Sequence, residues 1–415
     1  MAEAHSIVPP LLSAVPFILM LLGIAVLPLA VPRFWESNRN KALFSILLGA
    51  PIVVWTESVL PIELAHVIRD YIAFILLLGS LFVISGGIYL AGDLRVTPVV
   101  NAGFLAFGAV LANLIGTTGA SMVLIRPLLR TNGERRHVAH TVVFFIFLVS
   151  NVGGSLTPLG DPPLFLGYLN GVPFLWTLRL WPFWLGMTVA LLAIYLIWDR
   201  VLYAREDLTA RQVDRTRQEP LRLHGARNLF FLAGIIAAVA FLPPGWREAA
   251  MVLLALASLK VTSGEIRACN HFSWSPIVEV AVLFAGIFAT MVPVLQLLRV
   301  RGAALGVEAP WEFFWATGTL SSFLDNAPTY LTFFHLAQGL GLPAEVAGMP
   351  DSVLTGISLG AVFMGANTYI GNGPNFMVKA IAEARGVRMP SFGGYMLYSG
   401  VVLLPLFVIL SWVFL

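Results

Sequence analysis

The sequence has almost no cysteine, very little lysine and few charges of either sign. Cys269 is its only cysteine, which excludes an intrachain disulfide and a cysteine-ligated metal cluster. The three lysines, Lys41, Lys260 and Lys379, lie outside any G-x-x-x-x-G-K-S/T pattern, so the chain carries no Walker A loop of its own. Energy for any transport must therefore come from an ion gradient or from a partner protein.

Charged residues make up only 11% of the chain, whereas hydrophobic residues make up 58% and the mean hydropathy is +0.85. Apolar runs at 11–31, 71–90, 181–198 and 400–415 are long enough to cross a bilayer of roughly 30 Å. We therefore expect a single membrane transport domain over 1–415, surrounded by the lipid bilayer. The start of the sequence lacks a basic n-region and a clear cleavage site, so we interpret 11–31 as a retained span.

The apolar segments predict an all-α polytopic membrane protein with ten crossings and two re-entrant hairpins. The hairpins are expected at 96–130 and 310–340. The crossings are expected at 11–32, 41–58, 70–91, 138–169, 174–198, 228–246, 249–262, 276–298, 353–382 and 393–415.

The distribution of arginine and lysine predicts the orientation of the chain. Of the 25 basic residues, 20 lie in five segments that we place on the inner side of the plasma (inner) membrane, which puts both termini outside. These segments are 33–41, 92–137, 199–227, 260–275 and 379–392. We interpret 199–227 as a solvated cytoplasmic connector, and we favour topology anchoring over lipid or nucleic-acid binding there. No nucleic-acid partner is expected, although the pI is 9.1.

The two halves of the sequence resemble each other. The corresponding residues, with offsets of 206, 210, 212 and 214, are Phe82 and Phe288, Gly108 and Gly318, Gly153 and Gly365, and Trp198 and Trp412. We interpret 1–198 as a first repeat, with two leading helices over 11–58, and 228–415 as a second repeat. Because each repeat has five crossings, the second must lie upside down relative to the first, which makes an inverted repeat.

Each half also contains a polar stretch rich in Gly and Pro, at 153–163 and at 365–375. Lipid cannot satisfy the backbone groups that such a stretch frees, so it must line a cavity or bind something. Matching interruptions in two halves are typical of a transporter's substrate site. The acid here, Asp161, has helix capping as an alternative role. The candidate ligands are Asn151, Ser155, Thr157 and Asp161 at the first interruption, and Asn367, Thr368, Asn372 and Asn375 at the second.

Polar residues also mark the predicted tips of the two hairpins. They are Gly116, Thr117 and Thr118 in the first hairpin, and Asp325, Asn326 and Thr329 in the second. The first tip suits an anion or a cation, with tight helix packing as the alternative. A carboxylate at membrane depth costs on the order of 3 kcal/mol, so we expect the second tip to bind Na⁺ or a proton, with capping as a compatible role. The predicted Na⁺ ligands are Asp325, Asp161, Asn326 and Asn367.

Other ionisable residues receive no definite role from the sequence. Glu279 lies near the start of a predicted span and can be interfacial. His335, His137 and His140 can sense pH, although a histidine in a membrane protein is more often a packed hydrogen-bond donor. Lys379 can reach an anion, but snorkelling to the membrane surface is the simpler interpretation.

The polar segments resemble those of the ion transporter superfamily of secondary carriers. Residues 151–163, with Asn151-Val152-Gly153-Gly154 and Gly160-Asp161-Pro162-Pro163, resemble the first broken helix of its citrate-transport-like and sodium/proton antiporter branches. Residues 325–329, with Asp325-Asn326-Ala327-Pro328-Thr329, resemble their second hairpin tip. The resemblance covers 70–415 and implies a homodimer whose mobile transport domain moves against a scaffold domain in elevator fashion. It also implies that Asp161 and Asp325 belong to the cation site of D-type sodium/proton antiporters.

The sequence departs from the dicarboxylate-symporter branch, which has Ser-Asn-Thr at both tips. An acid at the tip would repel citrate unless Na⁺ neutralises it. We therefore expect a sodium/proton antiporter with Na⁺ and H⁺ as its ions and no other cofactor, and the alternative is a sodium-coupled symporter of citrate or another organic anion. An enzyme is not expected, because 158–161 lacks the G-x-G-D pattern of intramembrane aspartyl proteases and no H-E-x-x-H occurs. No repeated segment resembles a channel filter.

Overall fold

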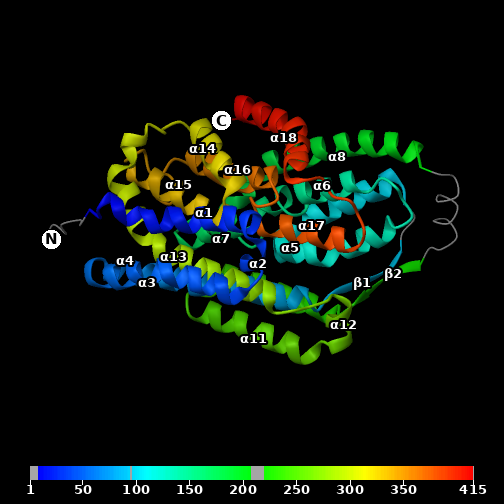
Figure 1. Cartoon of the computed structure of the whole chain (residues 1–415), viewed down its shortest axis with the longest axis horizontal. Coiled ribbons are helices and arrows are strands. Elements are labelled where there is room, and N and C mark those ends of the chain that lie inside the picture. The colour runs from blue at the N-terminus through cyan, green and yellow to red at the C-terminus, as the bar shows by residue number, and fades with distance from the viewer. Residues whose placement is uncertain (1–7, 94–95, 207–218, 415) are drawn as a thin grey trace.

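The computed structural model describes residues 8–93, 96–206 and 219–414 (Figure 1). Over these residues the chain is mainly helical, and eight helical segments are long and apolar enough to cross a membrane. They are Leu11–Pro28, Asn38–Val59, Pro61–Ser85, Pro98–Thr131, Ala139–Leu156, Phe174–Ala204, Ser275–Leu305 and Phe392–Val413. The protein is therefore a multi-pass integral membrane protein, as the composition predicts.

Seven of these segments match predicted crossings, and the eighth, Pro98–Thr131, is the first predicted hairpin. Two further predicted crossings correspond to shorter helices, α10 (Arg227–Phe241) and α11 (Trp246–Val261). Helix α4 (Pro61–Ser85) begins well before the predicted start at residue 70. Pro61 occupies its first turn, where proline is tolerated. Glu63 fits this polar turn because its Oε1 accepts a hydrogen bond of 3.1 Å from Gln296.

One layer of the molecule consists of long helices that contact one another directly. Figure 1 shows α3, α4, α11 and α13 along its lower side, with α5, α6, α8 and α14 to α18 above them. This lower layer and the segments at its edge include α4, α10 and α11, whose bounds are given above. They also include η1 (Leu11–Ala14), α1 (Val15–Ala30), α2 (Pro32–Trp35), α3 (Asn38–Val59), α12 (Gly264–Cys269), α13 (Ser275–Arg301) and η4 (Gly302–Leu305).

Helix α5 (Pro98–Thr131) folds back on itself, which confirms the first predicted hairpin. Its backbone breaks at Gly116, where φ is 77° and ψ is 154°. The side chains of Asn101 and Asn132 hydrogen bond over 2.8 Å although 31 residues separate them. At 1.5 Å per residue, a straight helix would hold these two residues about 46 Å apart.

The second predicted hairpin is also present. It consists of α14 (Pro310–Phe323) and α15 (Asn326–Gly339), joined at Leu324 and Asp325. The rings of Phe313, near the far end of α14, and of Phe333, in the middle of α15, lie 6.4 Å apart between centroids, so the arms run side by side. The second hairpin is thus built of two separate helices, whereas the first is bent at a single glycine.

Both predicted helix interruptions occur. Their elements are α6 (Ala139–Leu148), η2 (Val152–Leu156) and α7 (Pro162–Leu169) in the first half, and α16 (Asp351–Met364), η5 (Gly365–Asn367) and α17 (Gly373–Ala384) in the second. The helix before each interruption is the most enclosed part of the molecule: residues 140–148 and 353–364 are buried throughout. Protein therefore surrounds the backbone groups that the interruptions free, as the cost of leaving them in lipid requires.

A short antiparallel ribbon is the one departure from the all-α prediction in the described residues. It pairs β1 (Tyr89–Asp93) with β2 (Glu219–His224). Arg130 fastens the ribbon to α5, because its guanidinium donates to the carbonyls of Leu90 and Gly92 at 2.8 and 3.0 Å. The predicted connector 199–227 is thus partly strand, and its residues 207–218 lie outside the described residues. The remaining elements are η3 (Phe174–Leu180), α8 (Trp181–Ala204) and α18 (Phe392–Phe414).

Candidate functional site

The tip of the first hairpin docks onto the first helix interruption. The backbone N–H of Thr117 donates to the carbonyl of Gly160 at 2.8 Å. A Cβ atom on Gly116 would lie 3.2 Å from the carbonyl oxygen of Leu159, so the absence of a side chain at Gly116 allows this close approach. Thr118, next to Thr117, lines the open pocket described below.

Side chains from the same hairpin satisfy the backbone of the interruption. The side-chain oxygen of Asn113 accepts from the N–H of Leu156 at 2.8 Å, and Thr157 Oγ1 donates to the Asn113 carbonyl at 2.5 Å. Ser155 Oγ donates to the carbonyl of Val152 at 3.1 Å. Thr157 and Ser155 therefore stabilise the broken backbone in this structure, and Asn113 is a contributor that the sequence analysis did not single out.

Asp161 is the centre of the polar contacts. It is only 1% exposed. Its Oδ1 accepts from Thr117 Oγ1 at 2.7 Å and from Asn372 Nδ2 at 3.2 Å, and its Oδ2 accepts from Asn326 Nδ2 at 2.6 Å. These donors come from the first hairpin tip, the second hairpin tip and the second interruption. One carboxylate from the first interruption thus contacts all the other predicted polar segments.

Capping does not explain Asp161. It occupies the N-cap position of α7, but its side chain accepts no hydrogen bond from the start of that helix. Asp325 behaves differently, because its Oδ1 accepts from the N–H of Ala327 at 3.1 Å and so caps α15. Thr329 Oγ1 donates to the carbonyl of Asp325 at 3.0 Å. Asp325 makes no hydrogen bond to Asp161, but it lies close enough for its charge to act on that carboxylate.

The second interruption is joined to the first through asparagine side chains. Asn151 Nδ2 donates to Asn375 Oδ1 at 2.8 Å. Asn372 Nδ2 lies 3.2 Å from Asn151 Oδ1 and 3.0 Å from the carbonyl of Ser150. Asn375 Nδ2 in turn donates to the backbone of its own interruption, to Gly365 and Thr368. Asn151, Asn372 and Asn375 therefore form one connected group with Asp161.

Asn367 and Thr368 belong to a different polar group. Asn367 Nδ2 donates to Ser322 Oγ at 2.9 Å, and Thr368 Oγ1 donates to the Ser322 carbonyl. All three residues line a separate pocket of about 520 Å³ between α14 and α18. The structure thus separates Asn367, one of the four predicted Na⁺ ligands, from the hydrogen-bonded group around Asp161.

An open pocket of about 610 Å³ borders Asp161. One wall is apolar and consists of Leu77, Leu81 and Phe82 on α4 with Ile277 and Val280 on α13. The other wall is formed by the first hairpin tip and residues 158–162. Among the described residues that line this pocket there is no lysine, arginine or histidine. A negatively charged ligand would therefore find no cationic side chain here.

One buried oxygen beside the carboxylate has no hydrogen-bond partner. Asn326 is fully buried, and its Nδ2 donates to Asp161, but its Oδ1 is unpaired in the part of the chain that the structure describes. A buried unpaired acceptor is costly, so such atoms in native proteins call for an explanation. In those same residues, no group of three or more His, Cys, Asp or Glu side chains is placed to hold a metal ion.

The ionisable residues without a predicted role are engaged away from Asp161. Lys41 Nζ lies 2.6 Å from Glu279. His335 Nδ1 lies 2.9 Å from a guanidinium nitrogen of Arg299, and Lys379 pairs with Glu383 at 3.2 Å. The first two contacts join neighbouring helices, and the third lies within α17.

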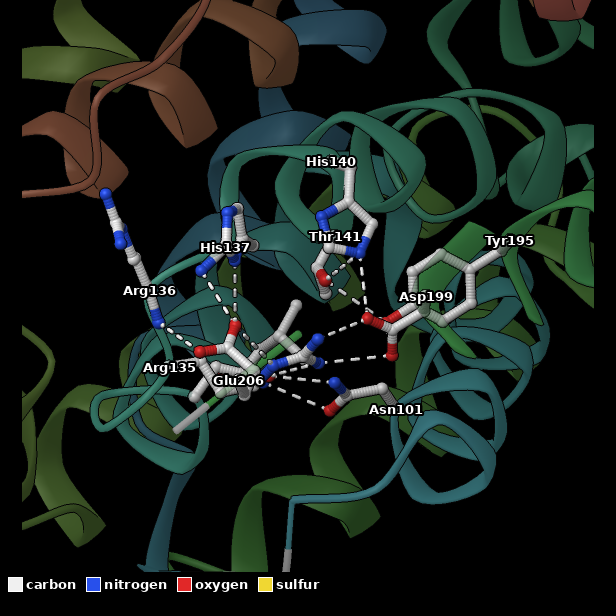
Figure 2. A network of polar contacts seen from close by, with 11 residues as sticks. Asn101, Arg135, Arg136, His137, His140, Thr141, Tyr195, Asp199 and Glu206 are labelled. Atoms are coloured by element: carbon white, nitrogen blue, oxygen red, sulfur yellow. Dashed lines mark hydrogen bonds and ion pairs between the residues drawn. The ribbon is translucent and has the colours of Figure 1, made fainter. Parts of the chain in front are cut away.

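Sequence reasoning also missed a buried ionic network at another end of the molecule. Figure 2 shows Arg135 between Asp199 and Glu206. The Arg135 guanidinium donates to both Asp199 oxygens, at 2.6 and 3.1 Å, and His140 Nε2 lies 2.8 Å from Asp199 Oδ1. The only sequence signal was the acid Asp199 inside an apolar helix, and its partners lie 59 and 64 residues away along the chain.

Broken helices, two hairpins and a buried polar centre define a multi-pass membrane carrier. The chain belongs to the family described as "Putative citrate transport", whose model matches residues 6–415. It is therefore a citrate-transporter-like secondary carrier. It is 25% identical over 400 residues to an uncharacterized transporter of Mycobacterium bovis and to one of Mycobacterium tuberculosis, and each alignment covers 84% of this chain and 88% of the relative.

Proposed function

We propose that this protein is a sodium/proton antiporter in which Asp161 binds Na⁺ and H⁺ in turn. The observation that carries the proposal is the environment of Asp161. It is a buried carboxylate joined to three other polar segments, and it borders a pocket whose described lining residues include no cationic side chain. A carboxylate at membrane depth is costly unless a proton or a cation neutralises it. Competition of the two ions for one group produces exchange without further machinery.

Asn326 gives the site a way to accommodate both ions. In the arrangement described, its amide nitrogen faces Asp161, as a carboxylate requires, and its Oδ1 is unpaired. The oxygen is a hard donor of the kind that alkali cations prefer. Rotation of the amide would also offer this oxygen to a protonated Asp161, which then needs an acceptor. On this proposal the unpaired Oδ1 of Asn326 becomes a ligand of Na⁺ or accepts a hydrogen bond from protonated Asp161. Asp325 adds negative charge at the edge of the site.

We further propose the architecture that the resemblance implies. Two inverted repeats, 1–198 and 228–415, would each contribute a re-entrant hairpin and a broken helix. These four segments would form the mobile part of an elevator, and the layer of α3, α4 and α13 would form the scaffold of a homodimer in the inner membrane, with both termini outside. The apolar pocket wall on α4 and α13 supports this division, because it offers Asp161 no polar partner that would hold the two parts together.

The alternative function is sodium-coupled symport of citrate or another organic anion. The family description favours it. The start of the helix that follows the first hairpin tip could bind a carboxylate through its backbone N–H groups. The absence of basic side chains from the described lining argues against a multiply charged anion, unless Na⁺ binds at Asp161 first and supplies the missing charge.

Exchange in proteoliposomes tests the proposal. An imposed Na⁺ gradient should drive proton movement, read with an entrapped pH dye, and Asp161→Asn should abolish it. Asp325→Asn is a sharper variant than alanine, because asparagine also caps helices and removes only the charge, and we expect it to slow exchange. Glu308→Gln, which removes an exposed acid, serves as the control and should leave exchange unchanged.

Two results would count against the proposal. Undiminished exchange in Asp161→Asn would exclude Asp161 as the ion-binding group, and exchange in Asp325→Asn as fast as in the parent would exclude a role for the second acid. Ligand binding to the folded state raises thermal stability, so stability with Na⁺, with citrate and with both separates the two functions. Stabilisation by citrate only in the presence of Na⁺ would favour symport.

A further inference from the structure

A second large cavity lies at the ends of several helices, far in sequence from Asp161. It measures about 1750 Å³ including its open mouth, and it lies among the loop 132–138, the end of α8, the start of α18 and the loop after α17. Five arginines and two histidines line it, namely Arg130, Arg135, Arg136, Arg385, Arg388, His137 and His140. No acidic residue is among the described residues of this lining.

Two acids that pair with residues of this lining are already engaged. Asp199 accepts from Arg135, His140 and Tyr195 (Figure 2). Glu206 accepts from the backbone N–H groups of Arg136 and His137, both at 3.0 Å. Neither carboxylate is therefore free to neutralise the arginines at the mouth of the cavity.

The arginines at the mouth have no such partners. Arg136, Arg385 and Arg388 are exposed, and across residues 8–93, 96–206 and 219–414 none of their side chains forms an ion pair. In Figure 2 the guanidinium of Arg136 points away from Glu206. Arg385 also acts on the like charge of Arg126, whose Nη1 is buried without a hydrogen-bond partner in the described structure. The cavity therefore gathers basic side chains, three of which form no ion pair with a described residue.

The cavity also has an apolar and aromatic side. The rings of Trp198 and Tyr398 stack there with centroids 5.3 Å apart and planes 12° from parallel. Leu129, Val138 and Leu202 complete this surface. Tryptophan and tyrosine are typical of the depth at which a membrane meets water. A ligand with an anionic group and an adjoining apolar part would match both sides of the cavity.

We propose that this cavity binds a phosphate-bearing anion, with Arg136, Arg385 and Arg388 as its charge partners. A guanidinium group matches the geometry of a phosphate and can donate two parallel hydrogen bonds to two of its oxygens. The same chemistry occurs in the headgroup of an anionic phospholipid and in soluble phosphate compounds. Topology anchoring explains arginines on one side of a membrane, but it does not require them to gather around one cavity that contains no acid among its described lining residues.

Binding of dioctanoyl phosphatidylglycerol to the full-length protein in neutral detergent tests the proposal. We compare Arg136→Gln/Arg388→Gln with Arg33→Gln/Arg39→Gln, a control that removes two exposed arginines from α2 and the start of α3. Each basic side chain near an anionic surface contributes about 1 kcal/mol, which corresponds to roughly fivefold in affinity. The cavity variant lacks two arginines and should therefore bind roughly 25-fold more weakly than the parent. The control should bind as the parent does.

The outcomes separate the two sources of phosphate. Competition by excess inorganic phosphate would support the proposal with a soluble phosphate compound as the occupant. Binding that persists in excess inorganic phosphate would support it with a lipid headgroup as the occupant. Equal weakening in both double variants, or no binding by the parent, would overturn it. The melting temperature without ligand should be the same for the cavity variant and the parent, which shows that any loss of binding does not come from misfolding.

Discussion

Replacing Gly116 with alanine should destabilise the protein by about 2–3 kcal/mol. The backbone angles at this residue, φ 77° and ψ 154°, lie in a region that is open essentially only to glycine, and a residue forced into such a region costs about 1–3 kcal/mol. The added Cβ would also lie 3.2 Å from the Leu159 carbonyl oxygen. That carbonyl cannot move freely, because the adjacent Gly160 carbonyl accepts from Thr117 at 2.8 Å. Strain and crowding therefore act in the same direction.

Gly103 provides a matched control in the same helix. It is exposed, and a Cβ atom built there meets no atom within 4 Å. An alanine in the middle of a helix is more stable than a glycine by roughly 0.5–1 kcal/mol, because the glycine loses more backbone freedom on folding. Gly103→Ala should therefore leave stability unchanged or raise it. The two substitutions add the same methyl group to α5, but they are expected to change stability in opposite directions.

The assay is unfolding of the purified protein in detergent, followed by tryptophan fluorescence as the temperature or the fraction of denaturing detergent rises. Gly116→Ala should unfold earlier than the parent and Gly103→Ala at the same point or later. If Gly116→Ala were as stable as Gly103→Ala, α5 would not turn at residue 116. The side-chain bond between Asn101 and Asn132 would then be absent, and the docking of the hairpin tip beside Asp161 would have no basis.

Two further predictions concern the ionic network in Figure 2. Arg135→Gln should lower the unfolding free energy by about 3–5 kcal/mol, because it leaves the buried Asp199 carboxylate without its bidentate partner. The double variant Arg135→Gln/Asp199→Asn should recover part of this loss in the same assay. Burial alone would raise the pKa of Glu206, but the backbone N–H groups of Arg136 and His137 hold this pKa below the ordinary glutamate value of 4.5. The contribution of Glu206 to stability is therefore present above pH 4.5 and is lost as the pH falls below that value. Melting temperatures measured across pH should therefore fall more steeply below pH 4.5 in the parent than in Glu206→Gln, and parallel curves would contradict this assignment.

The sequence allows the hairpins and the helix interruptions to be predicted because their signals are local. Gly116, Pro162 and Asn326 interrupt apolar runs with residues that free or redirect the backbone, and lipid would leave such groups unsatisfied. The early start of α4 was missed because the contact that accounts for it is not local in sequence. Its first turns contain charged residues that look like a loop when their partner on α13, Gln296, cannot be seen in the local sequence.

Predicting which polar residues meet requires the tertiary structure. Asn367 and Asn372 have the same side chain and lie five residues apart, but only Asn372 reaches Asp161, whereas Asn367 reaches Ser322. The irregular stretch between η5, which ends at Asn367, and α17, which begins at Gly373, redirects the chain between them, and no helical or strand period predicts the rotation. The ribbon β1–β2 and the Arg135–Asp199 pair likewise join residues far apart in the chain, so neither leaves a local pattern.

The position of Asp161 has a mechanical consequence if the proposed exchange is correct. Its two oxygens hold Thr117, Asn326 and Asn372 at once, and hydrogen bonds to an ionised acceptor are roughly twice as strong as bonds between neutral groups. Protonation would therefore weaken the contacts to the two hairpin tips and to the second interruption in a single step, whereas Na⁺ would preserve the charge but compete for the same oxygens. Ion occupancy and the cohesion of the four polar segments are thus coupled through one carboxylate. In the elevator that we propose, the moving part would have to stay intact while it is loaded and loosen while it exchanges its ion, and this coupling would provide both. No other acid among the described residues contacts all of these segments.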